Sequence, residues 1–540
     1  MWTDTFMKTR QDIEQLLTEH PEYRDALFCR GYYLTEDHDT DEKAYPFYGI
    51  WNVFMVKGFK CLVHPKQTYT LYEDNGWAFL LIGHAYNPFS MCHEETLLLK
   101  DCAIAYSKGK TEFFDCIIEW TGIFALFVIS DELLVVQDCG GIKGVYYGKV
   151  NGKTIITEFP QIAADLHGLT MDPFILELTT NRFFNIGNRY LPGDLSPFKE
   201  FRRLGANVYL AKDKNGQFFI NRFYPTCPHK ECKTEEDYNK IIAESFRILH
   251  NGIELASRKW SNGSISLSGG MDSKTTLACA NGCYDKFKYY SYQSKDTEIV
   301  DSEAAHTICG QIGLKHDIYK IESNNEEVKD FDVLKTIIDH TNAWVKNLAD
   351  NEIRKYIYFY RHPDLMDVEV KSWISEIVRV FFDRKYGFRM PRKLTPRHFS
   401  IFQTRYFLAP SLLWKSDELY KEYMRKFDLA EPKFNYEHTD LYYWEVRMSS
   451  WGMQVANSQD ICHTITFPFC NRKLVDMMLC VPREKRITDQ MHEDIIKLAN
   501  PKITAANIHI SNNYFKSKRI WLEKIYYYFR VIPYRLTHFQ

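Results

Sequence analysis

The sequence predicts a chain of two domains with a mixed α/β and α+β fold. A β-sandwich covered by helices is expected first, followed by a doubly wound parallel sheet with a helical C-terminal part. Three observations support this prediction. The length of 540 residues is too great for one hydrophobic core. Strand patterns dominate residues 48–127, and strand and helix patterns alternate after about residue 264.

The N-terminal half begins with a predicted helix, within residues 1–30, that has apolar side chains on one side. Three short strand patterns follow, at residues 51–56, 67–72 and 78–83. Two longer runs, 122–129 and 133–138, flank a polar turn at 130–132, which is the pattern of a β-hairpin. Both runs are apolar on both faces, so we expect helices to cover the sheets.

The second half begins after a polar, turn-rich segment at residues 213–233, which is predicted to carry the domain boundary. Residues 238–259 show an apolar stripe with a period of 3.6 residues, typical of a helix. Strands are then predicted at 287–292, 316–321 and 366–371, and helices at 302–312 and 330–345. This alternation predicts a parallel sheet that binds ligands above the carboxyl ends of its strands.

The most informative stretch is residues 264–274. Apolar residues alternate with serines as in a short strand, two glycines turn the chain, and a helix pattern follows. Free backbone N–H groups and the positive end of the helix dipole then face one point, which makes an anion site. Ser268 and Ser273 add hydroxyl donors, and Asp272 adds a carboxylate that could hold Mg²⁺ against phosphate oxygens. Ser273 stands where a Walker A loop requires glycine, which excludes that loop.

The pattern Ser-Gly-Gly-x-Asp-Ser at residues 268–273 resembles the pyrophosphate-binding loop of the ATP pyrophosphatases. The resemblance implies that ATP is split between its α and β phosphates, with ATP and Mg²⁺ as cofactors. It also implies an ATP site made of Leu267, Ser268, Gly269, Gly270, Asp272, Ser273 and Ser291. Two alternatives stay open: the loop is a tight turn without a ligand, and Ser291 is a buried serine of the next strand.

Three segments of the N-terminal half widen the resemblance: Gly122 to Leu126, Asp138 to Tyr147 and Leu191 to Phe198. They are similar to the glutamine amidotransferase domain of asparagine synthetases. That resemblance implies a class II amidotransferase-like domain with the N-terminal-nucleophile hydrolase fold, and an asparagine synthetase-like organisation of the whole chain.

Glutamine hydrolysis in that family needs a cysteine directly after the initiator methionine, because its thiol attacks the amide and its α-amino group acts as the base. Here Met1 is followed by Trp2, and the nearest cysteine is Cys29. We therefore expect a domain without glutaminase activity. Cys92 precedes His93, but adjacent residues on a strand point apart, which favours a structural thiol.

The resemblance places a second group of candidate residues after the third strand of the parallel sheet. Asparagine synthetases carry a Ser-Gly-Glu-Gly-Ala-Asp-Glu motif there, whose acids help to hold Mg²⁺ and the acyl acceptor. Glu376 retains the last acid, whereas Ser375 replaces the aspartate. Glu376 is thus a predicted catalytic residue and metal ligand, together with Asp272. Arg379, one helical turn later, is predicted to bind phosphate or a substrate carboxylate, with a surface Glu376–Arg379 pair as the alternative.

The family also places a lysine near the end of this domain to stabilise charge in the transition state. Lys485 or Arg486 is the candidate for that role, with a plain surface pair as the alternative. These residues follow the segment 467–474, in which Asn471 replaces the aspartate of the family pattern.

The composition limits the classes of partner. Lys and Arg total 68 and Asp and Glu total 70, so the net charge of −2 gives no broad field for nucleic acid or membranes. No apolar run of about 20 residues is present, and we expect a cytoplasmic protein without a transmembrane segment. The fourteen cysteines are scattered. The pairs Cys227/Cys232 and Cys279/Cys283 are too loosely spaced, and too lightly supported by histidine, to suggest zinc, so reduced thiols are expected.

These observations predict an inactive amidotransferase-like domain at residues 1–212, a linker at 213–235, an ATP-pyrophosphatase domain at 236–513 and a basic aromatic tail at 514–540. The expected activity is an ATP-dependent, AMP-forming amide ligation. A small-molecule or peptide carboxylate is activated as an acyl-adenylate and passed to ammonia or to a substrate amine, the latter as in β-lactam synthetases and lasso-peptide cyclases. The alternative is a catalytically silent ATP-binding protein that acts through a partner. A homodimer is possible, and the tail is expected to pack on the second domain or to form an interfacial helix.

Overall fold

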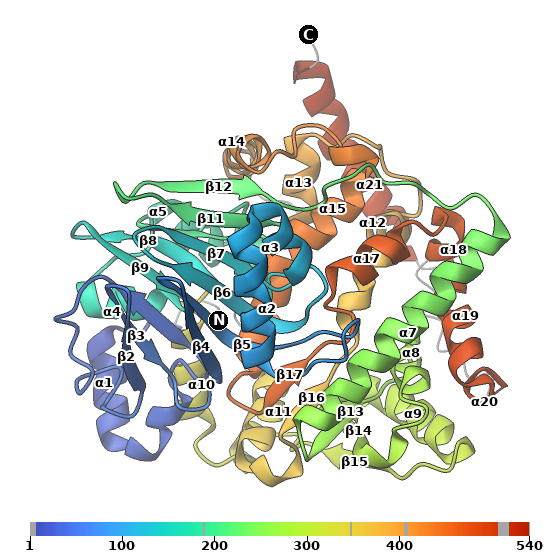
Figure 1. Cartoon of the computed structure of the whole chain (residues 1–540), viewed down its shortest axis with the longest axis horizontal. Helices are drawn as coiled ribbons and strands as arrows, with labels where there is room; N and C mark the ends of the chain where they lie inside the picture. The colour runs from blue at the N-terminus through green and yellow to red at the C-terminus, as the bar shows by residue number, and fades with distance from the viewer. Residues whose placement is uncertain (1–6, 187–189, 346–347, 404–408, 506–517, 539–540) are drawn as a thin grey trace.

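The protein consists of a sandwich of two antiparallel sheets and a separate parallel sheet, surrounded by helices (Figure 1). This computed structural model describes residues 7–186, 190–345, 348–403, 409–505 and 518–538. The sandwich and the parallel sheet, in this order along the chain, confirm the predicted fold class.

Each antiparallel sheet of the sandwich has six strands. The first sheet has the order β10 (Phe201–Arg203), β8 (Tyr146–Val150), β9 (Lys153–Thr157), β1 (Tyr32–Thr35), β3 (Phe59–Val63), β2 (Asn52–Val56). The second has the order β12 (Phe218–Arg222), β11 (Val208–Lys212), β7 (Leu133–Gln137), β6 (Thr121–Ile129), β5 (Trp77–Tyr86), β4 (Tyr69–Asp74). The helices of this half are α1 (Arg10–Glu19), α2 (Glu95–Lys108), α3 (Lys110–Ile117), α4 (Pro160–His167), α5 (Pro173–Thr180) and α6 (Arg182–Ile186).

The pattern of β6 explains why this sheet needs cover on both faces. All nine residues of β6 are buried, and nine of the ten residues of β5 are buried beside it. Strands with apolar residues on both faces require a layer on each side. One layer is the facing sheet, and the other is formed by α2, which contacts β4 and β5 (Figure 1).

The predicted hairpin at 122–138 is also present, with β6 and β7 paired in antiparallel register. After β7 the buried Asp138 carboxylate accepts backbone N–H bonds from Gly140, Ile142 and Lys143 at 2.8–3.0 Å. Asp138 therefore shapes the turn that carries the Asp-Cys-Gly-Gly-Ile-Lys pattern of the sequence.

The parallel sheet has five strands in the order β15 (His316–Lys320), β14 (Phe287–Gln293), β13 (Gly263–Ser266), β16 (Val368–Val370), β17 (Thr464–Thr466). Its helices are α7 (Glu235–Lys259), α8 (Met271–Cys279), α9 (Ile299–Gln311), α10 (Phe331–Thr341) and α11 (Asp350–Arg361). The helical C-terminal part comprises α12 (Phe381–Tyr386), α13 (Pro396–Gln403), α14 (Pro410–Lys426), α15 (His438–Leu441), a π-helix (Tyr442–Gly452), α16 (Met453–Gln459), α17 (Arg472–Leu479), α18 (Arg483–Ile487), α19 (Gln490–Ala499), α20 (Pro501–Ala505) and α21 (Lys518–His538).

β13 is the central strand, so the loop that follows it opens between β14 and β16 at the carboxyl edge of the sheet. The long helix α7 precedes β13 and contacts α8, α17 and α19 (Figure 1). The sheet topology thus places the sequence-predicted anion loop at the position where open parallel sheets bind ligands.

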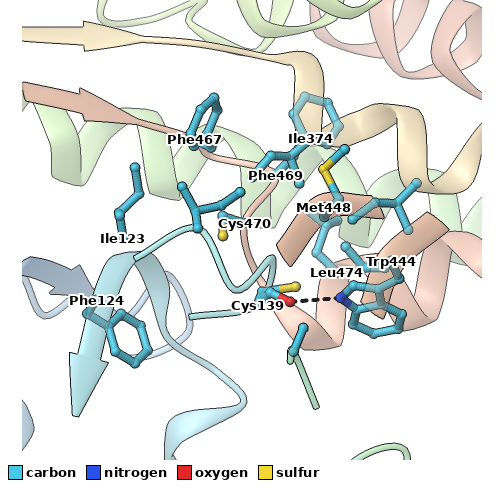
Figure 2. Packing of buried hydrophobic residues seen from close by; sticks show 14 of the residues in the cluster. Ile123, Phe124, Cys139, Ile374, Trp444, Met448, Phe467, Phe469, Cys470 and Leu474 are labelled. Carbon is cyan, nitrogen blue, oxygen red and sulfur yellow. Dashed lines mark hydrogen bonds between the residues drawn. The ribbon is translucent and has the colours of Figure 1, made fainter. Parts of the chain in front are cut away.

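A continuous apolar core joins the two halves (Figure 2). Ile123 of β6 points toward the side of Phe467 and Phe469, which follow β17, whereas Phe124 points the other way. The indole of Trp444, fully buried, donates to the backbone oxygen of Cys139 at 2.8 Å. Because buried indole N–H groups need an acceptor, this bond fixes the π-helix against the loop after β7.

Asn471 is the N-cap of α17 and also contacts the sandwich. Its side-chain oxygen accepts from the backbone N–H of Leu474 at 2.9 Å, while its amide nitrogen donates to the backbone oxygen of Glu119 at 2.7 Å. An aspartate keeps the cap but loses the donor. This double contact gives a physical reason for asparagine at the position where the family pattern has aspartate.

Changing Asn471 to aspartate is therefore expected to lower the free energy of unfolding by about 2 kcal/mol, because a buried carboxylate would face the Glu119 carbonyl. Urea unfolding followed by tryptophan fluorescence measures the change. Asp172, the half-exposed N-cap of α5, provides the control, since Asp172→Asn keeps the cap and should be neutral within about 0.5 kcal/mol. An equally small effect of Asn471→Asp would contradict the role given to the donor.

The segment at 213–235 contains a strand that the sequence analysis did not predict. After a turn, β12 pairs with β11 over five residue pairs and extends the second sheet. In the tail, α21 packs against α12 and α13, with Tyr527 buried, whereas Trp521 and Leu536 on its other side are exposed. Within the described ranges, the chain has no helix that combines the length and the apolar character needed to span a bilayer.

Candidate active site

The loop between β13 and α8 has the geometry of an anion site. The backbone N–H of Leu267 donates to the Tyr290 oxygen at 2.8 Å, so sheet pairing continues to the start of the loop. Gly270 is the N-cap of the nine-residue helix α8 and has extended backbone angles, and no side chain caps this helix. The first N–H groups of α8 therefore point out of the sheet edge without a capping acceptor.

The two loop serines brace the turn. The Ser273 hydroxyl donates to the backbone oxygen of Ser268 at 2.8 Å, and the Gly270 N–H donates to the Ser268 hydroxyl at 3.2 Å. A β-carbon at Gly270 would lie 3.2 Å from that hydroxyl oxygen, which is tighter than ordinary contact. Ser268 and Ser273 thus hold the loop in one conformation, and a side chain at Gly270 would require the Ser268 hydroxyl to shift slightly.

Ser291 makes hydrogen bonds within the parallel sheet. It is buried in β14, and its hydroxyl donates to the backbone oxygen of Leu267 at 2.7 Å and lies 3.0 Å from the His316 ring nitrogen. The hydroxyl is thus engaged within the protein just before the loop begins.

Ser291→Ala is accordingly expected to lower the free energy of unfolding by about 1 kcal/mol and to leave the Kd for ATP within about twofold. Chemical denaturation and equilibrium nucleotide binding measure the two quantities. A tenfold weaker Kd with unchanged stability would instead assign Ser291 to the nucleotide.

Asp272, Glu376 and Arg379 are brought together, as the sequence suggested. Nη1 of Arg379 contacts the Asp272 carboxylate at 2.6 Å and also the Glu376 carboxylate. The Ser375 hydroxyl donates to the other oxygen of Asp272. The Nε and Nη2 atoms of Arg379 bind the two oxygens of Asp489 at 2.8 and 2.7 Å. One guanidinium therefore links the loop helix α8, the turn after β16 and the start of α19.

The electrostatics of this cluster are dominated by burial and by Arg379. Burial raises the pKa of Glu376, and the guanidinium charge opposes that shift. Burial also disfavours ionised Asp489, but hydrogen bonds and charge from Arg379 and Arg384 outweigh it and hold its pKa well below its usual range. Burial disfavours the charged form of Arg379, but the surrounding carboxylates raise its pKa above the ordinary value. Three carboxylates and two guanidinium groups thus meet in one network, in which burial favours the protonated form of Glu376.

The pair Asp272 and Glu376 does not fit a magnesium site in this arrangement. Both carboxylates contact the same nitrogen of Arg379, so a cation already lies between them. A divalent ion at that point would have to displace the guanidinium. In the described part of the chain, three ligand atoms of His, Cys, Asp or Glu converge as for a metal ion at another place, formed by His229, Asp476 and Cys480.

Lys485 and Arg486 lie in other contacts. The Lys485 ammonium pairs with Glu235 at 3.0 Å and lies 3.4 Å from the ring centre of Tyr238. Arg486 is buried, and its Nη2 binds the Asp440 carboxylate at 2.9 Å. The backbone oxygen of Arg486 accepts from Arg384, which also binds Asp489. Lys485 thus contacts α7, and Arg486 supports the Asp272–Arg379 cluster through its backbone.

Four residues near the loop are not among the candidate site residues predicted from the sequence. Asp489 and Arg384 complete the ion network, as described above. Lys274 is buried in the first turns of α8; burial lowers its pKa, whereas Glu493 and Asp489 act in the opposite direction. The fully buried His492 has Nε2 at 4.0 Å from the Asp272 carboxylate, and burial lowers its pKa to about 4. His492 is therefore neutral at pH 7.

The N-terminal half presents no reactive thiol near its first strand in the part described. Met1 and Trp2 lie outside the described residues. The thiol of Cys29, just before β1, is buried and donates to the backbone oxygen of Asp460 at 3.2 Å. Burial raises the pKa of this thiol to about 11. Cys92 is half-buried and contacts the backbone oxygen of Glu94. A protonated, buried thiol such as Cys29 is a poor nucleophile.

No protein-family model and no curated protein matches this chain. Thirty solved chains match its structure. One is the glutamine phosphoribosylpyrophosphate amidotransferase from B. subtilis with ADP and GMP, at 10% identity over 56% of this chain and 63% of that chain, with a TM-score of 0.22.

Two other solved structures are among these matches. An allosteric regulatory enzyme of purine biosynthesis has 10% identity over 61% of this chain and 76% of that chain, with a TM-score of 0.24. A glutamine-dependent NAD+ synthetase from Acinetobacter baumannii with ADP has 11% identity over 44% and 41%, with a TM-score of 0.18. This chain thus spans less than two thirds of the first and third of these proteins, and TM-scores this low carry no inference on activity.

Proposed function

We propose that the protein is an ATP-dependent, AMP-forming amide-bond synthetase of the asparagine synthetase-like kind, acting in the cytoplasm. The observation that carries the proposal is the uncapped N-terminus of α8, directly after the central strand β13, with Asp272 and Arg379 beside it. Helix N-termini bind phosphate oxygens, and open parallel sheets bind ligands at this edge. The residue pattern at 268–273 supports ATP as the ligand.

In the proposed reaction, the loop of residues 267–273 holds the β and γ phosphates of ATP. A substrate carboxylate oxygen attacks the α-phosphorus, the bond to the β-phosphate oxygen breaks, and pyrophosphate leaves. A nitrogen nucleophile then attacks the acyl carbon and gives up a proton, and AMP leaves with the former carboxylate oxygen. Backbone N–H groups of the loop and the charge of Arg379 stabilise the negative charge that develops on the phosphates.

The nitrogen in this proposal does not come from glutamine hydrolysed by the chain itself. The buried thiol of Cys29, with its raised pKa, supports this part of the proposal. The nitrogen donor is therefore free ammonia, ammonia from a partner, or an amine of the substrate.

One observation favours a second candidate, an ATP-binding protein without turnover. Arg379 neutralises Asp272 and Glu376 together, and catalysis by either carboxylate requires this network to open. A silent protein needs no such rearrangement.

Product analysis separates the two candidates. The purified full chain is incubated with ATP, Mg²⁺, ammonia and a panel of carboxylates, and AMP, ADP and pyrophosphate are quantified. The synthetase predicts equal amounts of AMP and pyrophosphate with a subset of carboxylates. Nucleotide binding without AMP for every carboxylate and amine supports the silent protein, and absence of ATP binding contradicts both.

A further inference from the structure

A second group of polar side chains lies where the segment at 213–235 meets α17. His229 precedes α7, Asp476 belongs to α17, and Cys480 caps the end of α17. One ligand atom from each of these three residues lies within 4.8 Å of the other two. His229 Nδ1 and Cys480 Sγ are 3.9 Å apart, although the residues are separated by 251 positions in the sequence.

Backbone hydrogen bonds hold the segment in this position. The N–H of His229 donates to the Phe434 oxygen at 2.7 Å, and the N–H of Cys232 donates to the Cys480 oxygen at 2.8 Å. The imidazole and the thiol therefore meet because the main chain is fixed at His229 and again three residues later.

Asp476 is oriented by two phenols. Tyr224 donates to one carboxylate oxygen at 2.7 Å, and Tyr436 donates to the other. Each oxygen retains a further lone pair, because a carboxylate offers about four acceptor sites. Carboxylates that bind metals are commonly held by hydrogen bonds of this kind. The Tyr436 ring also packs at 4.7 Å from the His229 ring and limits its rotation.

The donor set matches the preferences of zinc. A thiolate, an imidazole and a carboxylate are the three side-chain ligand types that zinc takes, and a tetrahedral ion separates a sulfur from a nitrogen ligand by about 3.6 Å. The 3.9 Å observed between His229 and Cys480 is close to that value. Cys232 lines the same cavity as His229 and Cys480, but its thiol is not among the three converging ligand atoms, so its side chain has to turn toward them to become a fourth ligand.

We propose that His229, Asp476 and Cys480, with Cys232 as the fourth ligand, form a structural zinc site that fastens the segment at 213–235 to α17. The spacing of Cys227 and Cys232 alone does not suggest zinc, because the other ligands come from a distant part of the sequence. Zinc binding at neutral pH requires the Cys480 thiol to lose its proton, because the thiolate is the metal ligand.

The experiment is elemental analysis of the purified, tag-free full chain after reconstitution with zinc and removal of loosely bound ion. We expect about one zinc ion per chain, and at least a tenfold lower content in Cys480→Ser and His229→Gln. Cys92→Ser, a half-buried thiol of the other half, is the matched control and keeps the wild-type content. Tyr224→Phe removes one orienting hydrogen bond and should weaken zinc binding about tenfold without removing a ligand.

A second readout does not depend on the variants being folded. In the wild-type chain, zinc should slow alkylation of Cys480 and Cys232 at least tenfold relative to the metal-free chain, as followed by mass spectrometry of the peptides, while Cys92 is unaffected. A wild-type chain that binds no zinc, or equal alkylation of Cys480 with and without zinc, would overturn the proposal. Neither result bears on ATP binding at the loop, so the two proposals fail separately.

Discussion

Replacing Asp272 by alanine is expected to lower the rate of AMP formation by about a hundredfold or more. The Asp272 carboxylate holds both the Ser375 hydroxyl and the Arg379 guanidinium at the first turn of α8. Without it, Arg379 stays bound to Glu376 and Asp489 and is drawn away from the phosphate positions above the loop. Initial rates of pyrophosphate release, at saturating ATP and the active carboxylate, measure the loss.

The variant is expected to remain folded, because the Asp272 side chain is partly exposed and Arg379 keeps two carboxylate partners. Asp301→Ala is the matched control, since Asp301 is also an aspartate in the first turn of a helix of the same domain. It should retain the wild-type rate. If Asp272→Ala and Asp301→Ala have the same rate, Asp272 is not part of the catalytic site.

The second large effect is expected on stability. Arg379→Met removes the cation that contacts Asp272, Glu376 and Asp489, whose side chains are 20%, 26% and 19% exposed. Breaking a largely buried ion pair from one side costs about 3–5 kcal/mol, because carboxylates are left without compensation. Urea denaturation at pH 7 should show a loss of about this size.

Two controls test whether the loss comes from the carboxylates. Arg379→Lys keeps one charge but not the fork of donors, and should be intermediate. In the Arg379→Met background, Asp489→Asn should restore part of the stability by removing one uncompensated charge. A loss below about 1 kcal/mol for Arg379→Met would show that the network contributes little.

The pH dependence of stability provides a further test of the Arg379 ion network. The folded-state pKa of Asp489 lies below its unfolded value, so its contribution is present above about pH 4 and is lost as the pH falls below that value. The wild-type chain should lose stability steeply on acidification below about pH 4, and Arg379→Met should show a flatter curve over the same range.

The fold was predictable where the signal is local. The runs that became β5, β6 and β7 are apolar on both faces, and the Gly-Gly turn before α8 requires a strand and a helix on either side. Strand β12 was not recognised, because it is an exposed edge strand in a polar segment and pairs only with β11.

The candidate site was predictable only within about one helical turn of a motif. Glu376 and Arg379 are three residues apart and meet Asp272 through the sheet topology. Asp489 lies 110 residues after Arg379, and no local pattern marks it as a partner. His229 and Cys480 are separated by 251 positions, and no local pattern marks them as partners either. For Lys485 and Arg486, the motif identified the segment, but it could not show that Glu235 and Asp440 bind these side chains.

The formation of an acyl-adenylate is the central claim, and isotope transfer tests it most directly. The active carboxylate is labelled with heavy oxygen in both positions, and the AMP and amide products are analysed by mass spectrometry. The account predicts one labelled oxygen in the phosphate of AMP for each amide formed, because the carboxylate oxygen attacks the α-phosphorus and leaves with AMP. Unlabelled AMP, or label found in inorganic phosphate together with ADP, would contradict it.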